Sequence, residues 1–594
     1  MLLDHITSPQ DVKALDASAL PRLCEEARAA ILQSSAVVGG HVGSNLAVVE
    51  LTVALHRVFD SPTDKIIFDV SHQTYTHKML TGRAPSFLEP DRYDDLSGFA
   101  SPAESEHDLF AMGHTSTSIS LACGMARARD LAGQHHDIVA VIGDGSLSGG
   151  LAFEGLNALA EQDCGLIVVV NDNGWSIAEN HGGIYRNLAE LRRSGGTAAD
   201  NIFRAIGLDY RFLADGNDVY ALIDALEGLR GTTHPVVLHI CTTKGMGYGP
   251  AMRDPENWHH VGPFSIEAGA SKPPANRHPQ LEETYAQITG EHLQQRISAD
   301  PDVVVVSAAT PYILGFTPER RAAAGRQYVD TGIAEEHAVT FSCGLARAGA
   351  KPVLGLYGVF MQRAYDQLWH DMCLNNLPVT ILDFGGSVFG ANDATHLGYF
   401  DLALQGALPG LTCLAPACRE EYLAMLDWAI DYRGGPVVIR VPGADVISRP
   451  DLAPAPGASF ETPRYQVARD GSEVAILALG SFFEDGEAVA DELERRAGLH
   501  PTVVNPRFAT DFDEQLLRGL PRRHRVVVTL EDGVLEGGWG EKIARLLGPS
   551  GAKVLCYGIH KGFHDRFQPA ELLTQNGLTV RGIVRDALLA LQDD

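Results

Sequence analysis

Short apolar segments rich in Val, Ile and Leu recur along the 594-residue chain and constrain its fold most strongly. Each has four to seven residues without apolar–polar alternation, which is typical of strands buried on both faces. The intervals between them are long enough for helices. We therefore expect α/β domains in which helices cover mainly parallel sheets. The predicted strands are Lys65–Val70, Ile138–Gly143, Leu166–Asn171, Val236–Cys241, Val303–Ser307, Val353–Tyr357, Val379–Asp383, Val437–Val441, Val474–Gly480, Thr502–Asn505, Val526–Glu531 and Val554–Gly558.

Two proline clusters divide the chain. Ala268–Gln280 and Arg449–Pro463 combine several prolines with small residues, a composition that favours extended, exposed chain. Since a domain has roughly 150 to 200 residues, about three domains are expected. The predicted domains are 1–275, 276–455 and 456–594.

The composition excludes several classes of protein. A formal net charge of -28 is unsuited to binding nucleic acid or an anionic membrane. The nine cysteines form no CxxC pair, which indicates reduced thiols and a cytoplasmic protein. Met1–Pro9 lacks the basic and apolar regions of a signal peptide, and no apolar run reaches the length of a transmembrane helix.

A pair of polar motifs follows two of the predicted strands. Ile138–Ile142 leads into Gly143-Asp144-Gly145, and the next strand ends in Asn171-Asp172-Asn173. Glycines at such a position let the backbone approach a phosphate closely. An aspartate there requires a cation, and Asp144 with Asn173 offers the hard oxygen ligands that Mg²⁺ prefers. A lone GDG is usually a surface turn, but the pair is more specific.

This pair resembles the diphosphate-binding motif of thiamine-diphosphate enzymes, and further motifs resemble the 1-deoxy-D-xylulose-5-phosphate synthase family. Those motifs are Gly40–Ser44, Asp69–Gln73, His77-Lys78, Gly113–Ser118, Ile333–Phe341 and Phe360–Gln367. The resemblance covers almost the whole chain. It implies a transketolase-like fold with diphosphate-binding, pyrimidine-binding and C-terminal domains. It also implies a homodimer and a place in isoprenoid biosynthesis.

The resemblance implies thiamine diphosphate and Mg²⁺ as cofactors. Asp144, Asn173 and the backbone carbonyl of Trp175 would bind the metal. Phe360 would stack on the pyrimidine ring, and Ile177 would support the thiazolium. The cofactor-binding residues would be His72, His114, Gly143, Asp144, Gly145, Ser146, Asn173, Ile177, Lys244 and Phe360.

The resemblance also implies the catalytic residues. Glu335 matches the family's activating glutamate, whose carboxyl shares a proton with the pyrimidine ring. His41, His259 and His396 match histidines that contact the donor substrate. Neutral imidazoles suit this work because they donate hydrogen bonds and move protons near pH 7. Arg363 is a further catalytic candidate, and Tyr357 is expected to line the acceptor pocket.

The sequence departs from the family pattern at two places. The segment after Glu179–Gly182 is shorter than the family's insertion. In addition, two arginines expected to bind the acceptor's phosphate are missing, because Phe384 follows Asp383 and Gly443 follows Pro442.

Other features of the acceptor region are expected to matter. Arg440, which lies two residues before Pro442, is an arginine of the family pattern that this chain retains. Arg449 is the nearest arginine in sequence that could replace the missing ones. The loop Gly390–Thr395 is one residue longer than usual. The family's aspartate for the acceptor hydroxyl therefore falls on Asn392 or Asp393.

Several functions fit this pattern. The leading hypothesis is a carboligase that decarboxylates pyruvate and adds the two-carbon unit to an aldehyde. The aldehyde is D-glyceraldehyde 3-phosphate in the family, and we expect a changed, unphosphorylated acceptor here. The alternatives are a transketolase, an E1-like 2-oxoacid dehydrogenase component and an inactive paralogue. Retention of Asp144, Asn173 and Glu335 argues against the inactive paralogue.

Overall fold

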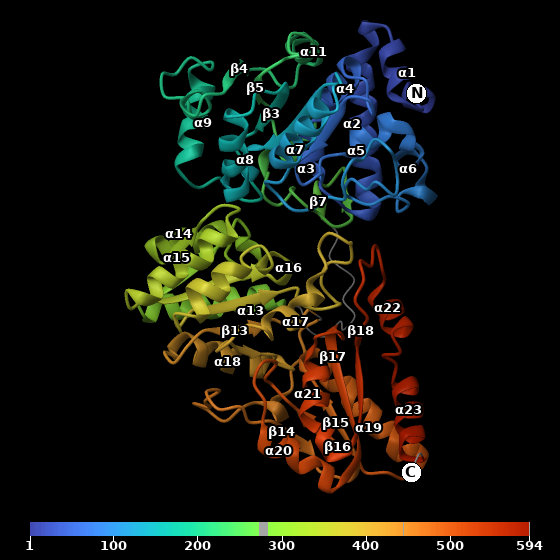
Figure 1. Cartoon of the computed structure of the whole chain (residues 1–594), viewed down its shortest axis with the longest axis vertical. Coiled ribbons are helices and arrows are strands. Elements are labelled where there is room, and N and C mark those ends of the chain that lie inside the picture. Colours follow the sequence, from blue (N-terminus) through green and yellow to red (C-terminus); the bar gives the residue numbers. More distant parts are fainter. Residues whose placement is uncertain (272–282, 444, 593–594) are drawn as a thin grey trace. The chain divides into compact units, whose positions relative to one another are not determined.

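The computed structural model describes residues 1–271, 283–443 and 445–592, which form two compact units (Figure 1). Unit 1 contains Met1–Ala275 and Gly332–Ala334, and unit 2 contains Asn276–Thr331 and Glu335–Asp594. Most of the proline-rich segment Ala268–Gln280, with the predicted boundary at 275/276, lies outside the described residues. The boundaries of the three domains stay a prediction.

Unit 1 is built on a parallel sheet of the order β1-β2-β3-β5-β4. Its strands are β1 (Lys65–Phe68), β2 (Ile138–Gly143), β3 (Leu166–Asp172), β4 (Asp209–Leu213) and β5 (Pro235–Cys241). A separate two-stranded sheet is formed by β6 (Phe264–Ser265) and β7 (Ala270–Ser271).

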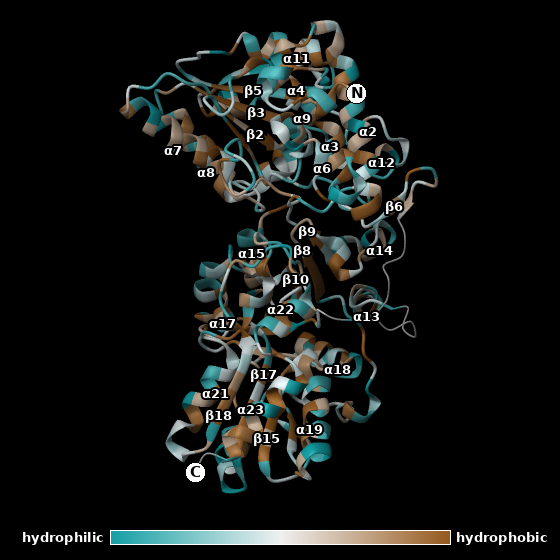
Figure 2. Ribbon diagram, turned by 90° about the vertical axis from the view of Figure 1, so that its right-hand side faces the viewer, coloured by the Kyte–Doolittle hydropathy of each residue, from teal (hydrophilic) through white to brown (hydrophobic). Residues whose placement is uncertain are grey.

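Helices cover both faces of the unit 1 sheet. Successive strand residues point to opposite sides, so neighbouring apolar residues of one strand pack against different helices. Val168 of β3 belongs to the cluster with α7 (Ser118–Leu131), α8 (Gly150–Ala160) and α9 (Gly183–Arg193). Its neighbour Val169 packs in the cluster with α4 (Val49–Val58) and α11 (Val219–Glu227). Figure 2 shows the strands of this sheet as predominantly hydrophobic. The remaining helices of unit 1 are α1 (Pro9–Ala14), α2 (Leu20–Val38), α3 (Val42–Ala47), α5 (Tyr75–Lys78), α6 (Pro85–Leu88), α10 (Ile202–Ala205) and α12 (Gly249–Arg253).

Unit 2 contains a parallel sheet of the order β12-β13-β11-β10-β8-β9. Its strands are β8 (Val303–Ser307), β9 (Tyr328–Asp330), β10 (Lys351–Tyr357), β11 (Thr380–Phe384), β12 (Thr412–Leu414) and β13 (Val437–Arg440). The helices associated with it are α13 (Tyr285–Ala299), α14 (Pro318–Ala324), α15 (Glu335–Arg347), α16 (Gly358–Met361), α17 (Asp401–Gln405) and α18 (Arg419–Asp431).

The C-terminal sheet of unit 2 has the order β14-β16-β15-β17-β18, and only β14 runs antiparallel to its neighbour. Leu477 of β15 belongs to the same hydrophobic cluster as the six-stranded sheet, whereas Ile476 faces α19 and α23. This shared core explains why the two sheets form one unit. The strands are β14 (Gln466–Arg469), β15 (Glu473–Ala478), β16 (Thr502–Asn505), β17 (His524–Val534) and β18 (Lys553–Ile559). The helices are α19 (Phe483–Ala497), α20 (Glu514–Gly519), α21 (Trp539–Leu547), α22 (Pro569–Gln575) and α23 (Val580–Gln592).

The predicted fold class is confirmed: mainly parallel sheets are covered by helices. Every predicted strand has a counterpart. Short strands at sheet edges, such as β4, β9 and β14, were not predicted, because they are partly exposed and lack a continuous apolar run. Over the described residues, no helix is both long and apolar enough to cross a membrane.

Candidate active site

The first group of predicted site residues lies at the carboxyl edge of the unit 1 sheet. Gly143, the last residue of β2, is in register with Asn171 of β3. The buried Asp144 follows, and its Oδ2 accepts hydrogen bonds from the Gly174 backbone N–H at 3.0 Å and from Asn180 Nδ2 at 2.7 Å. The structure therefore brings the two halves of the GDG…NDN pair together.

The donor atoms at this edge fit a hard divalent cation. Burial, followed by the nearby Asp172 carboxylate, raises the pKa of Asp144 to about 8. Asn180 Oδ1 is buried and has no hydrogen-bond partner among the described residues. Asn173 Oδ1 lies 3.0 Å from the Trp175 backbone N–H, which donates to it. A carboxylate with amide and carbonyl oxygens is the ligand type that Mg²⁺ prefers, although the individual ligands stay predictions.

Close packing beside Asp144 explains why Gly145 is a glycine. A Cβ at position 145 would lie 2.9 Å from Ser176 Cα. The buried Lys244 Nζ donates to the Ser176 carbonyl at 2.6 Å, and the half-buried Ile177 follows Ser176 in the chain. Burial lowers the pKa of Lys244 to about 7, although the Asp144 carboxylate opposes this shift. The Lys244 amine is thus held close to the motif.

Asp69 organises the loop that carries His114. Its two carboxylate oxygens accept hydrogen bonds from the backbone N–H groups of Ser116 and Ser118, at 2.8 and 3.0 Å. Ser116 Oγ in turn donates to the carbonyl of Ser146 at 2.8 Å. His114 lies two residues before Ser116, so this network ties its loop to the residue that follows the GDG turn.

The backbone around these loops is strained. Val70, Ser71 and Ser116 have φ angles of 60°, 68° and 73°, in the left-handed region that side chains disfavour. Such conformations cost on the order of 1–3 kcal/mol each and persist where surrounding contacts enforce them. The strained pair Val70-Ser71 directly precedes His72, another predicted site residue.

Three predicted histidines of unit 1 form a cluster. The ring centroid of His41 lies 5.0 Å from that of His72 and 5.6 Å from that of His259. Two residues that were not predicted complete it, since His260 lies 4.7 Å and Phe99 5.5 Å from His41. The only sequence signal for His260 is that it directly follows the predicted residue His259, and Phe99 has no such signal.

His259 is prepared to act as a neutral imidazole. Burial, with the Lys244 charge as the next cause, lowers its pKa well below the ordinary histidine value. Ser44 Oγ lies 3.4 Å from its Nδ1. A neutral ring near pH 7 retains one donor and one acceptor.

The segment after Gly182 forms helix α9, which contacts both halves of the GDG…NDN pair. Tyr185 donates a hydrogen bond from its hydroxyl to the Gly145 carbonyl at 3.2 Å. Arg192 forms an ion pair with Asp172. The helix thus connects the GDG turn to the end of β3.

Asp172, His239 and Cys241 have the spacing of a metal-ligand group. However, Asp172 already binds Arg192 and His239 Nε2, the latter at 2.9 Å. His239 Nδ1 lies 2.8 Å from the Tyr210 hydroxyl. Burial raises the pKa of the Cys241 thiol to about 12, so the thiolate form that metals require is disfavoured. This cluster is better explained as support for β3.

The second group of predicted residues lies in unit 2. Glu335 begins α15 and is buried, and Arg363 Nη1 lies 3.4 Å from its Oε2. Burial raises the pKa of Glu335, and the Arg363 charge offsets part of that rise. The Phe360 ring lies 5.8 Å from Tyr357 and 5.6 Å from His396, both in edge-on geometry. The structure therefore places Tyr357, Phe360 and His396 in one aromatic row.

The loop that carries His396 is held at several points. Asp393 Oδ1 lies 3.2 Å from His396 Nδ1. The Ala394 backbone N–H donates to Asp565 Oδ1 at 2.9 Å, and Asn392 Nδ2 donates to the Phe567 carbonyl at 3.1 Å. Of the two residues expected at the family's aspartate position, Asp393 is thus the one paired with the histidine.

The two positions at which the resemblance predicts arginine, 384 and 443, are occupied in different ways. Phe384 ends β11 in register with Tyr357 and is buried in the core of the six-stranded sheet. A Cβ added at Gly443 would lie 2.8 Å from Ser387 Cβ. Ser387 is itself fixed, because its Oγ donates to Asp532 Oδ2 at 2.6 Å. The space for a side chain at 443 is therefore filled.

The retained arginines have other partners. Arg440 is buried and forms ion pairs with Asp401 and Asp532. Arg449 forms ion pairs with Asp451 at 2.7 Å and Glu487 at 2.7 Å. Both guanidinium groups are therefore engaged by carboxylates of this chain.

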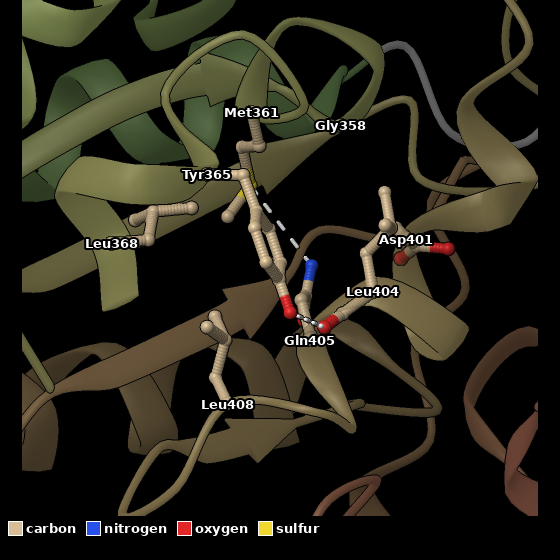
Figure 3. A pocket seen from close by; sticks show the side chains of 8 residues that line it. All are labelled: Gly358, Met361, Tyr365, Leu368, Asp401, Leu404, Gln405 and Leu408. Carbon is tan, nitrogen blue, oxygen red and sulfur yellow. Dashed lines mark hydrogen bonds between the residues drawn. The ribbon is translucent and has the colours of Figure 1, made fainter. Parts of the chain in front are cut away.

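A small, mostly apolar pocket lies beside α16 (Figure 3). Gln405 Nε2 approaches Met361 Sδ at 3.9 Å, and the Tyr365 hydroxyl donates to the Leu404 carbonyl at 3.4 Å. None of its lining residues is a predicted site residue. We therefore interpret this pocket as a packing gap. The lining residues are Gly358, Met361, Tyr365, Leu368, Asp401, Leu404, Gln405 and Leu408.

Family matches place these helix-covered parallel sheets in the thiamine-dependent transketolase class. The pyrimidine-binding domain of transketolase matches residues 282–446, and the transketolase C-terminal domain matches residues 464–583. The family model described as 1-deoxy-D-xylulose-5-phosphate synthase matches residues 3–201.

Curated relatives identify the family. The synthase 1 of Geobacter sulfurreducens is 38% identical, with 98% of this chain and 96% of that protein covered. The synthases of Pelotomaculum thermopropionicum and Symbiobacterium thermophilum are 38% and 39% identical, covering 99% and 100% of this chain and 96% of each relative. The chain belongs to the 1-deoxy-D-xylulose-5-phosphate synthase family, as its motifs predicted, and is a transferase of the transketolase class.

Proposed function

We propose that this enzyme uses thiamine diphosphate and Mg²⁺ to decarboxylate pyruvate and add the two-carbon unit to an uncharged aldehyde. Carbon dioxide leaves, and one carbon–carbon bond forms to give a hydroxyketone. When bound, thiamine diphosphate supplies the nucleophilic carbon that amino-acid side chains lack. A homodimer, a cytoplasmic location and a role in isoprenoid biosynthesis stay expectations.

The unit 1 edge supports binding of the metal and the diphosphate. Asp144, Asn173 and the Trp175 carbonyl would hold Mg²⁺. Gly145 and Ser146 would offer hydrogen bonds to the diphosphate, and Lys244 would add a positive charge in its protonated form. This assignment is supported by the buried Asp144 carboxylate and the unpartnered Asn180 Oδ1, which a cation would satisfy.

The histidine cluster supports binding of a small 2-oxo acid. His41 and His259 would donate hydrogen bonds to its carboxylate and carbonyl, while His72 would face the cofactor. The lowered pKa of His259 keeps its ring neutral, so that it orients the substrate without a fixed charge.

Glu335 would hold a proton at its carboxyl and share it with the pyrimidine ring. Its burial raises its pKa, which favours the proton-carrying form. Phe360 would stack on that ring, and Arg363 would limit how far the pKa of Glu335 rises.

The occupation of positions 384 and 443 carries the proposal of an uncharged acceptor. A phosphate monoester carries nearly two negative charges, and removing its water is costly without charged donors. Arginine side chains usually provide these charged donors, and each charged hydrogen bond contributes about 1.5–3 kcal/mol to binding. Phe384 has no side-chain donor, and Ser387 fills the space beside Gly443.

Steady-state kinetics with pyruvate tests this function. D-glyceraldehyde 3-phosphate and D-glyceraldehyde form a matched pair, because they differ only in the phosphate. We expect kcat/KM to be at least as high for D-glyceraldehyde. A value for the phosphorylated aldehyde well above that of every plain aldehyde would contradict the changed acceptor and leave an ordinary 1-deoxy-D-xylulose-5-phosphate synthase.

The donor is tested separately by carbon dioxide release from pyruvate. His259→Gln should raise KM for pyruvate. If the loaded wild-type enzyme releases no carbon dioxide from pyruvate with any aldehyde, the donor assignment is wrong. A ketol donor would then favour a transketolase activity, and acyl transfer to a lipoyl group would favour an E1-like component.

A further inference from the structure

A tyrosine that was not predicted from the sequence lies beside the predicted acceptor residue Tyr357. Tyr312 belongs to the helical turn Pro311–Leu314, which follows β8. Its hydroxyl accepts a hydrogen bond from the Tyr357 hydroxyl at 3.2 Å. The two rings lie 6.4 Å apart. The pair therefore joins the chain after β8 to the end of β10.

The position of the pair follows from the sheet. β8 and β11 are the parallel neighbours of β10, so their carboxyl ends meet at one edge. Tyr357 is in register with Phe384, one of the positions where the family pattern has arginine. Tyr312, Tyr357 and Phe384 thus place aromatic side chains where a charged clamp is expected.

The two tyrosines are exposed to solvent, and one of their hydroxyl groups can still donate a hydrogen bond. Tyr312 is 47% exposed, and Tyr357 is partly exposed. A phenol donates one hydrogen bond and accepts others. Since the Tyr357 O–H group donates to Tyr312, the hydroxyl hydrogen of Tyr312 is free for a ligand. Tyr357 also packs edge-on against Phe360, which in turn contacts His396.

We propose that Tyr312 is a specificity-determining residue of the acceptor site. Its hydroxyl, held by Tyr357, would bind a hydroxyl oxygen of a short, uncharged hydroxyaldehyde. The inference rests on the proposed function and deepens it, because it names the acceptor class. Neutral phenols suit a hydroxyl group but do not replace the charged donors that a phosphate needs.

Tyr312→Phe tests this role because it removes only the hydroxyl. With D-glyceraldehyde, kcat/KM should fall about tenfold, as expected for the loss of one hydrogen bond. With propionaldehyde, which has no hydroxyl group, kcat/KM should stay within about twofold. KM for pyruvate and the melting temperature should not change.

Tyr220→Phe is the matched control. Tyr220 lies on α11, is 44% exposed and donates its hydroxyl to the Ala17 carbonyl at 3.0 Å. This variant should behave as the wild type with both aldehydes.

Two outcomes would overturn the inference while leaving the proposed function intact. One is an equal loss with both aldehydes in Tyr312→Phe, and the other is no loss with either. If the wild-type enzyme does not consume pyruvate with any aldehyde, the proposed function fails, and this inference fails with it.

Discussion

Glu335 and its neighbour Glu336 differ in burial although they are adjacent in the sequence. Glu335 is buried at the start of α15 beside Arg363, whereas Glu336 is partly exposed. The difference arises because adjacent helical residues point about 100° apart. Burial raises the pKa of Glu335, which suits a group that must hold a proton.

Glu335→Ala should therefore lower kcat for pyruvate consumption by at least about 100-fold, the usual range for a positioned acid–base group. Cofactor affinity, measured by calorimetry, should change little. Glu336→Ala is the matched control and should retain activity. A fully active Glu335→Ala enzyme would rule out the predicted role.

At the scale of elements, α9 links the two strands that carry the GDG and NDN motifs. It holds the GDG turn through Tyr185 and the end of β3 through Arg192. The Asp172 side chain is fully buried, whereas the Arg192 side chain is 34% exposed. The carboxylate therefore depends on this contact and on His239 for its stability.

Arg192→Gln should destabilise the enzyme because it leaves the buried Asp172 with one partner fewer. We expect a loss of about 1–3 kcal/mol in the free energy of unfolding of unit 1, measured in urea. The control is Arg193→Gln, since the side chain of Arg193 is 73% exposed and pairs with Glu190 on the surface. Equal stability of the two variants would show that α9 does not support the motif.

The sequence predicted the buried strands and the motifs better than the contacts between distant loops. Continuous apolar runs identify β2 or β10, because burial on both faces leaves a local signal. Asn180, Phe99 and Tyr312 carry no such signal. They reach their partners only when loops after different strands meet, and this depends on the complete sheet.

For the whole molecule, cofactor binding and stability are linked. A ligand at 100 times its Kd stabilises the folded state by about 2.7 kcal/mol. Thiamine diphosphate with Mg²⁺ should therefore raise the melting temperature, and either alone should do so less. Asp144→Ala should abolish the shift, since the charge of the diphosphate would lose its bound counter-ion.

Asp163→Ala provides the control for this experiment, because Asp163 is an exposed aspartate of the same unit. It should show the full shift. A normal shift in Asp144→Ala would show that the metal is bound elsewhere.

Arg440 differs from the other positions where the family pattern has arginine. Its guanidinium is the buried counter-ion of Asp401 and Asp532, so replacing it alone would strand two carboxylates in the core. Phe384 and Gly443 pair with no buried carboxylate in this chain, so a neutral residue at these positions leaves no buried charge without a partner. Substitution at positions 384 and 443 is thus tolerated by the core, whereas Arg440 can be exchanged only together with its partners.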